Sequence, residues 1–395
     1  MTVVLLILAV LEGLYFTAVY SDIPFIAKWR NIYIQTAMST MRHQWLATYF
    51  IPQDIINGIM VKVQASQAAQ IGVNTSWDGK TGTADSKDAD EKAVQMAANG
   101  MTPDQIAFYE LFWELDQSSM EAYVKAHPDV VSNGWDQIKI NAAGLDEDGT
   151  DIRTTMGEQV LAIDAPNQIL LVRVKGDNFC GVLAVAKDPS RLSVKNSTML
   201  GSAGQYAGTI AQNNGGILAM TASSFIDNGG TGNGGTLAGY TMSDGDGSGA
   251  HMGWSYKRLE LHEDNRMYIT DAQSSVGSGT TDAVEFTPAL IVDGKVLVDQ
   301  NCGWTAVNPR ACIGQSEKGE VLMLVIEGRL VGYSLGTGVV ECADILRQHN
   351  CAQAMNLDGG TSAILWYDGA YVTRCSNRAC PQGRPLPNAF VYQGR

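Results

Sequence analysis

The first twenty residues form an almost unbroken apolar run, in which Thr2, Glu12 and Thr17 are the exceptions. A helix of this length is just long enough to cross the hydrocarbon core of a bilayer. No small-x-small cleavage site follows the run, which favours an uncleaved signal anchor and leaves a removed signal peptide as the alternative. We therefore predict a transmembrane helix over residues 1–20.

Apolar and polar residues then alternate at roughly helical spacing over residues 21–60, with Pro24 and Pro52 as breaks. The apolar positions suited to one shared helix face are Ile32, Ala37, Met38, Met41 and Trp45. Such a face fits a helix close to the membrane, and a stalk that self-associates would show the same pattern. We predict a helical stalk and linker region over residues 21–150.

Within that region, residues 81–92 are polar and charged, which predicts a linker or an exposed loop. Residues 102–105 read Thr-Pro-Asp-Gln and have the pattern of a capped helix start. The apolar positions that then recur on one face as far as Pro128 are Ile106, Tyr109, Trp113, Met120 and Val124. This spacing predicts a helix that packs against a core.

The pattern changes to a period of two near Leu161, which predicts strands and hairpins. Apolar runs over residues 170–174 and 182–186 flank a Gly-Asp-Asn turn and form the first hairpin. Asp-Gly turns recur at residues 293–294 and 368–369, each between apolar runs.

The clearest helix of this second part spans residues 338–349. It lies between an apolar strand at residues 321–326 and a strand that leads to Asn356. Strands with few helices predict an α+β domain built on a mixed sheet, which we place at residues 151–395.

The composition of the chain disfavours some classes of function. The 395-residue chain has a formal net charge of −14, so it lacks the basic excess that would neutralise nucleic-acid phosphates. The hydrophobic fraction of 45% is ordinary for a globular protein. Many of the 42 glycines fall between Gly201 and Gly279, which predicts loop-rich β structure there.

Six of the seven cysteines lie between Cys302 and Cys380, which predicts disulfide bonds in an oxidising exterior. Cys375 with Cys380 and Cys342 with Cys351 are sterically reasonable pairs, but six cysteines allow 15 pairings and none is assigned. A zinc site is the alternative to disulfides. The sequence has no Cys-x-x-Cys motif and its histidines are scattered, which argues against zinc. Reduced thiols in a cytoplasmic protein stay open as well.

The orientation in the membrane depends on the cysteines. Lys28, Arg30 and Arg42 follow the apolar run, and the positive-inside rule taken alone would place the rest of the chain in the cytoplasm. Clustered cysteines favour the opposite side. We predict a single-pass protein whose main domain is extracellular.

Residues 356–362, Asn-Leu-Asp-Gly-Gly-Thr-Ser, lie between two short apolar runs and form the strongest candidate site. Gly359 and Gly360 let the backbone approach a ligand closely. The polar side chains that converge beside them are those of Asn356, Asp358, Thr361 and Ser362. The alternative is a tight turn whose side chains cap their own backbone.

Two arginines, Arg310 and Arg329, lie at or near the ends of apolar runs, with Glu327 close to the second. A guanidinium group suits the two free oxygens of a phosphate diester. A structural salt bridge is the alternative for either arginine. The glycine-rich residues 228–235 predict a mobile lid or a backbone cradle for an anion, in which Gly234 and Gly235 expose their amides, or else a surface loop.

Two further motifs lead to other functions. Residues 244–248 resemble the start of a calcium loop, but its twelfth position is Ser255, so we predict a turn and leave calcium as the one open cofactor. Residues 332–336 match the Gly-x-Ser-x-Gly elbow of serine hydrolases around Ser334. The only later histidine is His349, fifteen residues on and within the next helix, which disfavours a triad.

Four blocks stand in the order and spacing of the phosphodiester glycosidase family, which the chain resembles from about residue 170 to residue 391. These blocks are residues 308–314, 326–329, 356–362 and 387–391. Many bacterial members are called exopolysaccharide-related. The resemblance implies a similar α+β architecture and hydrolysis of an α-linked sugar 1-phosphodiester, with an N-acetylglucosamine-like sugar.

The resemblance also extends to Phe225 and Asp227, which precede the glycine-rich loop as in family members. Two departures stand out: many relatives have Asp at the position of Glu327, and Asn-Gly or Asn-Ala where this chain has Ala222-Ser223-Ser224. The extra methylene of glutamate would carry its carboxylate further, and a serine would have to replace the expected amide.

Breaking a sugar–phosphate linkage at the anomeric carbon needs a carboxylate to stabilise an oxocarbenium-like centre, while the leaving phosphate needs charge neutralisation more than protonation. We predict Asp358 as nucleophile or water-activating base and Glu327 as the second carboxylate, with Arg310 and Arg329 facing the phosphate. The predicted substrate-binding residues are Asn356, Gly359, Gly360, Thr361, Ser362, Asp227, Gly234 and Gly235.

The sequence therefore predicts a membrane-anchored glycosidase that acts on a cell-surface glycan or exopolysaccharide. Its expected partners are the glycan and the membrane, with no nucleic acid and with self-association through the stalk as a further outcome. A non-catalytic module that binds cell-wall glycan is the alternative from another class. A serine esterase acting through Ser334 is the third hypothesis.

Overall fold

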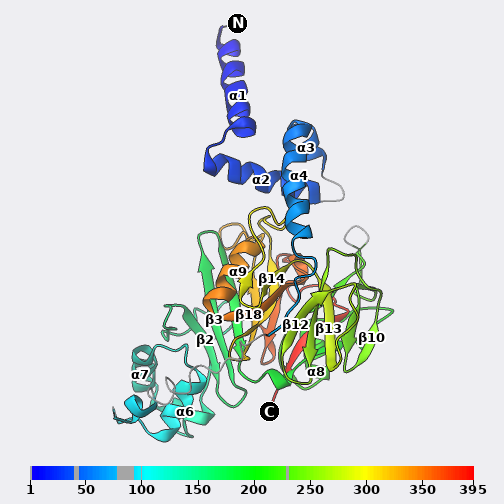
Figure 1. Cartoon of the computed structure of the whole chain (residues 1–395). Coiled ribbons are helices and arrows are strands. Elements are labelled where there is room, and N and C mark those ends of the chain that lie inside the picture. Colours follow the sequence, from blue (N-terminus) through cyan, green and yellow to red (C-terminus); the bar gives the residue numbers. More distant parts are fainter. Residues whose placement is uncertain (1, 40–43, 78–92, 99, 228–230) are drawn as a thin grey trace.

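A computed structural model describes residues 2–39, 44–77, 93–98, 100–227 and 231–395. The predicted linker at residues 81–92 and the predicted face residue Met41 lie outside these ranges. The N-terminal helices are α1 (Thr2–Tyr20), α2 (Pro24–Ser39), α3 (Trp45–Thr48) and α4 (Gln53–Ala68). Figure 1 shows α1 pointing away from the rest of the molecule and α4 leading down to it.

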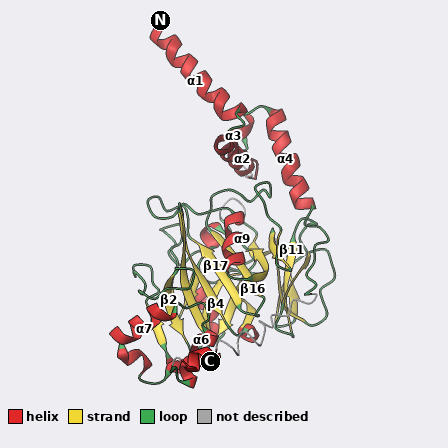
Figure 2. Cartoon of the chain, turned by 60° about the vertical axis from the view of Figure 1, so that its left-hand side comes forward, coloured by secondary structure: helices red, strands yellow, loops and turns green. Residues whose placement is uncertain are grey.

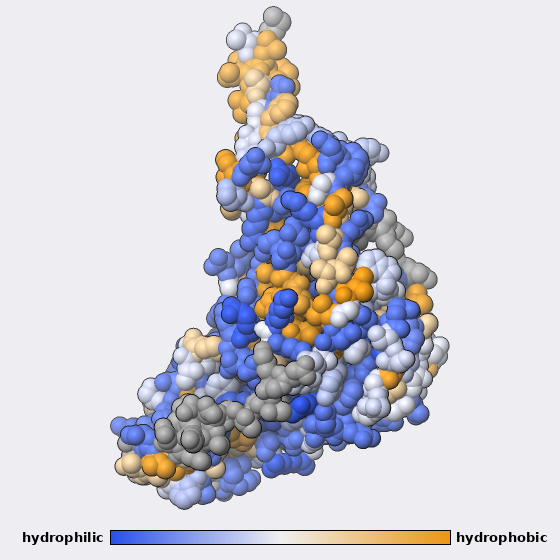
Figure 3. All heavy atoms as spheres, in the orientation of Figure 1, coloured by the Kyte–Doolittle hydropathy of each residue, from blue (hydrophilic) through white to orange (hydrophobic). Residues whose placement is uncertain are grey.

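The helix α1 is the one helix in the described residues that is long and apolar enough to cross a membrane. Its apolar side chains are exposed, for example Val3 at 70% and Leu6 at 67%. Apolar residues cover α1 on the face shown in Figure 3. At its C-terminal end, Arg30 donates to the carbonyl oxygens of Val19 (2.8 Å) and Ser21 (3.0 Å), which fixes the corner between α1 and α2.

We call α2–α4 the stalk and residues 139–395 the body. The stalk has a small core of its own, which includes Ile34, Ala37 and Ile56, whereas Trp45 of the predicted face is exposed. It is also tied to the body, because Gln35 donates to Gln300 O (2.9 Å). Figure 2 shows the stalk meeting the body at the lower end of α4.

The helices α6 (Pro103–Leu111) and α7 (Gln117–Ala126) follow. The predicted capping box is present, because Thr102 accepts from the amide of Gln105 while the Gln105 side chain accepts from the amide of Thr102. The single helix expected as far as Pro128 is wrong, since Leu115 leaves the helix to pair with Thr154 and Asp116 caps α7.

A nine-stranded sheet organises the described body. In spatial order its strands are β1 (Lys139–Asn141), β2 (Gln159–Asp164), β3 (Ile169–Gly176), β4 (Phe179–Ala186), β17 (Val321–Ile326), β16 (Arg310–Ser316), β18 (Cys351–Asn356), β14 (Ala289–Val292) and β15 (Lys295–Val296). The predicted hairpin of β3 and β4 is confirmed, as is the helix α9 (Val339–Gln348). The edge strand β1 precedes residue 151, where we placed the start of the domain.

Three smaller sheets complete the described body. One contains, in order, β20 (Ala370–Tyr371), β19 (Leu365–Tyr367), β6 (Gly216–Thr221), β21 (Asn388–Gln393) and β5 (Leu192–Asn196), with α8 (Ala207–Asn213) packed on it. Another contains β10 (Asp246–Ser248), β9 (Thr241–Ser243), β13 (Thr280–Phe286), β11 (Lys257–His262) and β12 (Met267–Asp271). The last pairs β7 (Ser224–Phe225) with β8 (Leu237–Ala238).

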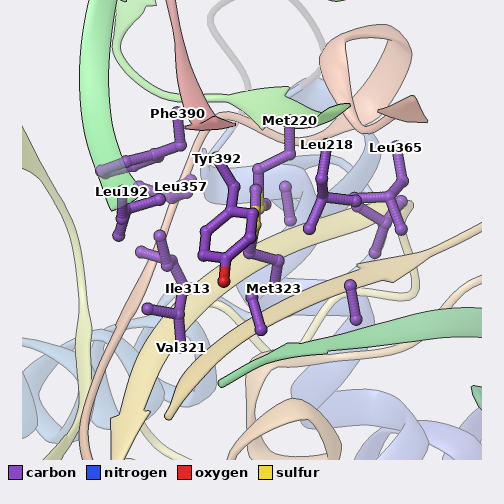
Figure 4. Packing of buried hydrophobic residues seen from close by; sticks show 14 of the residues in the cluster. Leu192, Leu218, Met220, Ile313, Val321, Met323, Leu357, Leu365, Phe390 and Tyr392 are labelled. Atoms are coloured by element: carbon purple, nitrogen blue, oxygen red, sulfur yellow. The ribbon is translucent and has the colours of Figure 1, made fainter. Parts of the chain in front are cut away.

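The α+β class is confirmed, although every strand pair in the described residues is antiparallel where the sequence predicted a mixed sheet. Alternate side chains of β16 and β17, such as Ile313 and Met323, face Met220 of β6 and Tyr392 of β21 in one core (Figure 4). The opposite face of the nine-stranded sheet packs against α9, α6 and α7. The central strands are buried on both faces, and the candidate site begins where β18 ends beside the start of β16.

Candidate active site

The loop after β18 carries the central motif. Leu357 donates its amide to Ala311 O (2.8 Å) and Gly360 donates to Pro309 O (3.1 Å), so the loop lies against the start of β16. A β-carbon at Gly359 would lie 2.6 Å from Pro309 O, and Gly360 has a φ of +59°. Both positions therefore require glycine for a structural reason.

Asp358 is half-buried at the turn of this loop, where it accepts hydrogen bonds from the Ser362 side chain and the Gly359 amide. Burial raises the pKa of Asp358 to about 6, and Ser362, the Arg384 charge and the Gly359 amide oppose this rise. The Asp227 charge adds to it. Asp358 is thus ionised at neutral pH, yet it accepts a proton far more readily than an ordinary aspartate.

Arg384 and Asp227 form an ion pair that acts on Asp358. The Arg384 Nη1 lies 2.5 Å from Asp227 Oδ2, and its Nη2 donates to Gly232 O (2.7 Å). The Gly232 amide in turn donates to Asp227 Oδ1 (2.9 Å). Because the guanidinium carbon also lies 4.5 Å from the centroid of the Phe225 ring, Arg384 is held on three sides.

The sequence motifs predicted Asp227 as a site residue but did not indicate Arg384. The available signal was its place in a Pro/Gly-rich loop, three residues before the matching motif at 387–391. Charge alone gave no way to choose it over Arg374 or Arg378, because only the fold brings residue 384 to residue 227.

Arg329 lies over the glycines of the central loop. Its Nη1 would be 3.5 Å from a β-carbon at Gly360, and its Nη2 donates to Asn308 Oδ1 (3.0 Å). Its backbone has a φ of +59°, and the residue is exposed. The structure thus brings Arg329 beside the loop with its side chain exposed, and its predicted role toward the phosphate stays a prediction.

The predicted anion-binding role of Arg310 is wrong. Its side chain is 5% exposed and donates to three backbone carbonyls: those of Thr337 (3.1 Å), Trp304 (2.9 Å) and Ala306 (2.7 Å). A guanidinium fork occupied in this way stabilises the chain before β16.

Asn356 is also a structural residue rather than the predicted substrate ligand. It is fully buried, and its Nδ2 donates to Thr287 O (2.9 Å). Ser362 is buried and hydrogen-bonded to Asp358, so it orients that carboxylate. Thr361 stays half-buried and accepts from Ser376 Oγ at 3.3 Å.

Glu327 lies under the surface, 2% exposed. Its Oε1 accepts from the Arg374 amide. Burial raises the pKa of Glu327, and the Tyr333 hydroxyl, the Arg374 amide and the positive charges of Arg173 and Arg374 oppose this rise. The structure thus places Asp227, rather than Glu327, as the carboxylate whose charge acts on Asp358.

Gly234 and Gly235 do not form the predicted anion cradle. A β-carbon at Gly234 would lie 2.1 Å from Pro385 O, and one at Gly235 would lie 2.6 Å from Ala203 N. Both glycines are needed for close backbone packing. The first part of the glycine-rich loop, residues 228–230, lies outside the described residues.

The serine hydrolase hypothesis is wrong. Ser334 is buried, and its Oγ donates to Glu327 O (2.6 Å) and accepts from Cys180 N (3.0 Å). His349 instead contacts Glu158, with Nε2 to Oε1 at 3.1 Å. The elbow motif is therefore a structural turn.

The acidic turn at residues 244–248 and the cysteines have structural roles. Asp244 pairs with Lys195 (2.5 Å) in the β9–β10 turn, and the described residues hold no group of three or more metal-ligating side chains. All seven cysteines are described and free, so the predicted disulfides are not formed. Cys342 of α9 and Cys351 of β18 instead pack in the apolar core as small hydrophobic residues.

Residues 207–393 match the family model described as phosphodiester glycosidase. No curated protein matches the chain. Similar solved structures include the auto-inhibited catalytic domain of zebrafish N-acetylglucosamine-1-phosphodiester α-N-acetylglucosaminidase, with 16% identity and a TM-score of 0.47 over 57% of this chain and 82% of that one. A hypothetical protein from Synechocystis is similar at 13% identity and a TM-score of 0.40, over 59% of this chain and 63% of that one.

The family match spans the central loop, Arg329, Arg384 and Asp227, whereas the stalk lies outside it. It also confirms the resemblance that the sequence motifs indicated. Residues 207–393 therefore resemble the phosphodiester glycosidase family in sequence.

Proposed function

We propose that this protein is a glycosidase that hydrolyses an α-linked sugar 1-phosphodiester. The observation that carries the proposal is Asp358, a carboxylate with a pKa of about 6 on which the Arg384 charge acts, in a loop whose Gly360 lies beside the Arg329 guanidinium. The family match over the same residues supports the reaction class.

Asp358 supplies the negative charge that an oxocarbenium-like centre needs at the anomeric carbon. It acts either as the nucleophile or as the base that takes a proton from the attacking water. The bond between the anomeric carbon and the phosphate oxygen breaks, and its electron pair leaves with the phosphate monoester. Arg329, which is exposed beside Gly360, neutralises that leaving group.

Asp227 is the second carboxylate of the proposed mechanism in place of Glu327. The Arg384 guanidinium bonded to it keeps the two acidic groups from repelling each other strongly. Thr361 and the backbone of Gly359 and Gly360 are the remaining contacts for the sugar or phosphate.

We further propose that α1 anchors the enzyme in a membrane and that the body faces outward, toward a cell-surface glycan or exopolysaccharide. The free thiols do not support an oxidising exterior, so the outward orientation rests on the expected location of the glycan. An N-acetylglucosamine-like sugar is proposed on the resemblance alone.

The test is turnover of a panel of sugar 1-phosphodiesters by the full chain in detergent, with wild type beside Asp358→Asn. We expect the substitution to lower turnover by about 10³-fold or more, since it removes a charge that acts on the reacting carbon. Asp246→Asn, on the exposed β10 strand, is the matched control and should keep full activity.

Full turnover by the Asp358→Asn protein would disprove the assigned role. No turnover of any diester by the wild type, with glycan binding intact, would instead support the non-catalytic binding module.

A further inference from the structure

A cavity of about 510 Å³ lies between the stalk helix α4 and the body. Its volume falls within the usual range of small-molecule pockets. The lining residues that matter here are Gln64 and Gln67 of α4 and Tyr256, Trp304, Asn308 and Arg310 of the body. The cavity thus combines residues on both sides of the point where the stalk meets the body (Figure 2).

The walls of this cavity are held in place. On the stalk side, Gln70 donates to Ala289 O (3.2 Å) and accepts from the Ala289 amide (3.2 Å), which fixes the end of α4. On the body side, buried Arg310 binds the carbonyls of Trp304 and Ala306. The cavity is therefore largely preformed, which lowers the entropy lost on binding.

The chemistry of the lining favours a neutral ligand rich in hydroxyl groups. The side-chain amides of Gln64, Gln67 and Asn308 present both donors and acceptors, as hydroxyl groups require. Trp304 and Tyr256 are half-buried and offer apolar ring surface. Arg310 is the one charged lining residue, and its Nε and Nη2 already donate to backbone carbonyls, so the guanidinium has no pair of nitrogens left for a bidentate contact with an anion.

Asn308 connects the cavity with the candidate active site. Its side chain lines the cavity and also accepts from Arg329, whose guanidinium lies over Gly360. The next residue, Pro309, accepts the Gly360 amide at 3.1 Å. A polymer bound with its phosphodiester at Arg329 would reach the cavity with an adjacent unit.

We propose that this cavity binds a neutral hexopyranose unit of the glycan next to the scissile phosphodiester, so that α4 contributes to substrate recognition. That this sugar unit is the neighbour of the scissile phosphodiester rests on the proposed function. That the cavity binds a sugar does not depend on it. Because α4 lies outside residues 207–393, the α4 side of the subsite comes from this chain's own N-terminal segment.

The test is calorimetric titration of the full chain in detergent with three neutral oligosaccharides: the tetramers of N-acetylglucosamine, glucose and mannose. We expect saturable binding of at least one, weakened about tenfold by the double substitution Gln64→Ala and Gln67→Ala, since two hydrogen bonds of ordinary strength are lost. Gln64 is exposed and Gln67 half-buried, so the protein should keep its fold.

Gln53→Ala is the matched control, because Gln53 lies at the other end of α4 and bonds to Asn57 (2.9 Å). It should bind the same oligosaccharide as tightly as the wild type does. Unchanged affinity in the double variant, an equal loss in the control, or no binding of any tetramer by the wild type would overturn the proposal. Asp358→Asn separates the two proposals, since it should abolish turnover and retain oligosaccharide binding.

Discussion

The charge of Asp358 decides what the candidate site does at a given pH. Its pKa of about 6 lies above that of an ordinary aspartate, chiefly because the carboxylate is buried. As nucleophile or base it must be ionised, so we expect kcat/KM to rise with pH through about 6 and then level off. A pH–rate profile at constant ionic strength measures this, and a flat profile between about pH 5 and 7 would contradict it.

Arg384 supplies a positive charge that lowers the pKa of Asp358. We expect Arg384→Ala to move the rising limb of the pH–rate profile to higher pH and to lower turnover about 10²-fold. Arg378→Ala, an exposed arginine six residues earlier, is the control and should leave the limb in place. An unshifted limb in Arg384→Ala would show that its charge does not reach Asp358.

The sequence motifs predicted only some of the residues of the candidate active site. The block around Asp358 could be found because two glycines and several polar groups lie within seven residues. Arg310 and Asn356 have equally suitable chemistry, but their side chains turn inward to bind Trp304 O and Thr287 O. That direction depends on backbone carbonyls brought close by the fold, which the sequence does not display.

At the scale of elements, a buried ion group joins the segment after α6 to the nine-stranded sheet. Lys187, 3% exposed, lies 2.5 Å from Glu114 Oε1 and 2.8 Å from Glu320 Oε1. Trp113 also donates to Glu320 at 2.8 Å. This group is a buried polar contact between the two parts, so its loss should lower the free energy of unfolding.

We expect Lys187→Met to lower the free energy of unfolding by about 3–5 kcal/mol, because two buried carboxylates lose their counter-charge. Urea unfolding followed by circular dichroism measures the loss. Lys318→Met is the control, since Lys318 is exposed and lies over the Trp113 ring at 3.9 Å, and it should cost under about 1 kcal/mol. A similar small loss in both proteins would contradict the expectation.

Helices and hairpins that depend on residues close in sequence could be predicted. The distant segments with which they pair or pack could not. The hairpin of β3 and β4, the capped start of α6 and the helix α9 each depend on neighbouring residues, and all are present. The break between α6 and α7 depends on Leu115 pairing with Thr154, which is distant in sequence. For the same reason, no local pattern of residues indicated that β1 forms the edge of the large sheet.

At the scale of the whole molecule, α1 is the proposed link to the membrane. We expect the full chain to stay in the membrane fraction after alkaline carbonate extraction, and a chain lacking residues 1–20 to be released. The reason is the burial in lipid of the largely apolar 19-residue helix α1. Retention of the shortened chain would show that exposed stalk aromatics, such as Phe25 and Tyr49, hold it there.

The order of the strands has a consequence for how the protein is made. The last strand, β21, pairs with both β5 and β6, so it fills the middle of its sheet. Synthesis from Leu192 to Asn388 takes about 10–40 s at usual ribosomal rates. Until then β6 has an unpaired edge and Phe390 is missing from the core, which exposes the nascent chain to aggregation. We therefore expect the body to fold only after its synthesis is nearly complete, and to depend on a chaperone that shields the growing chain.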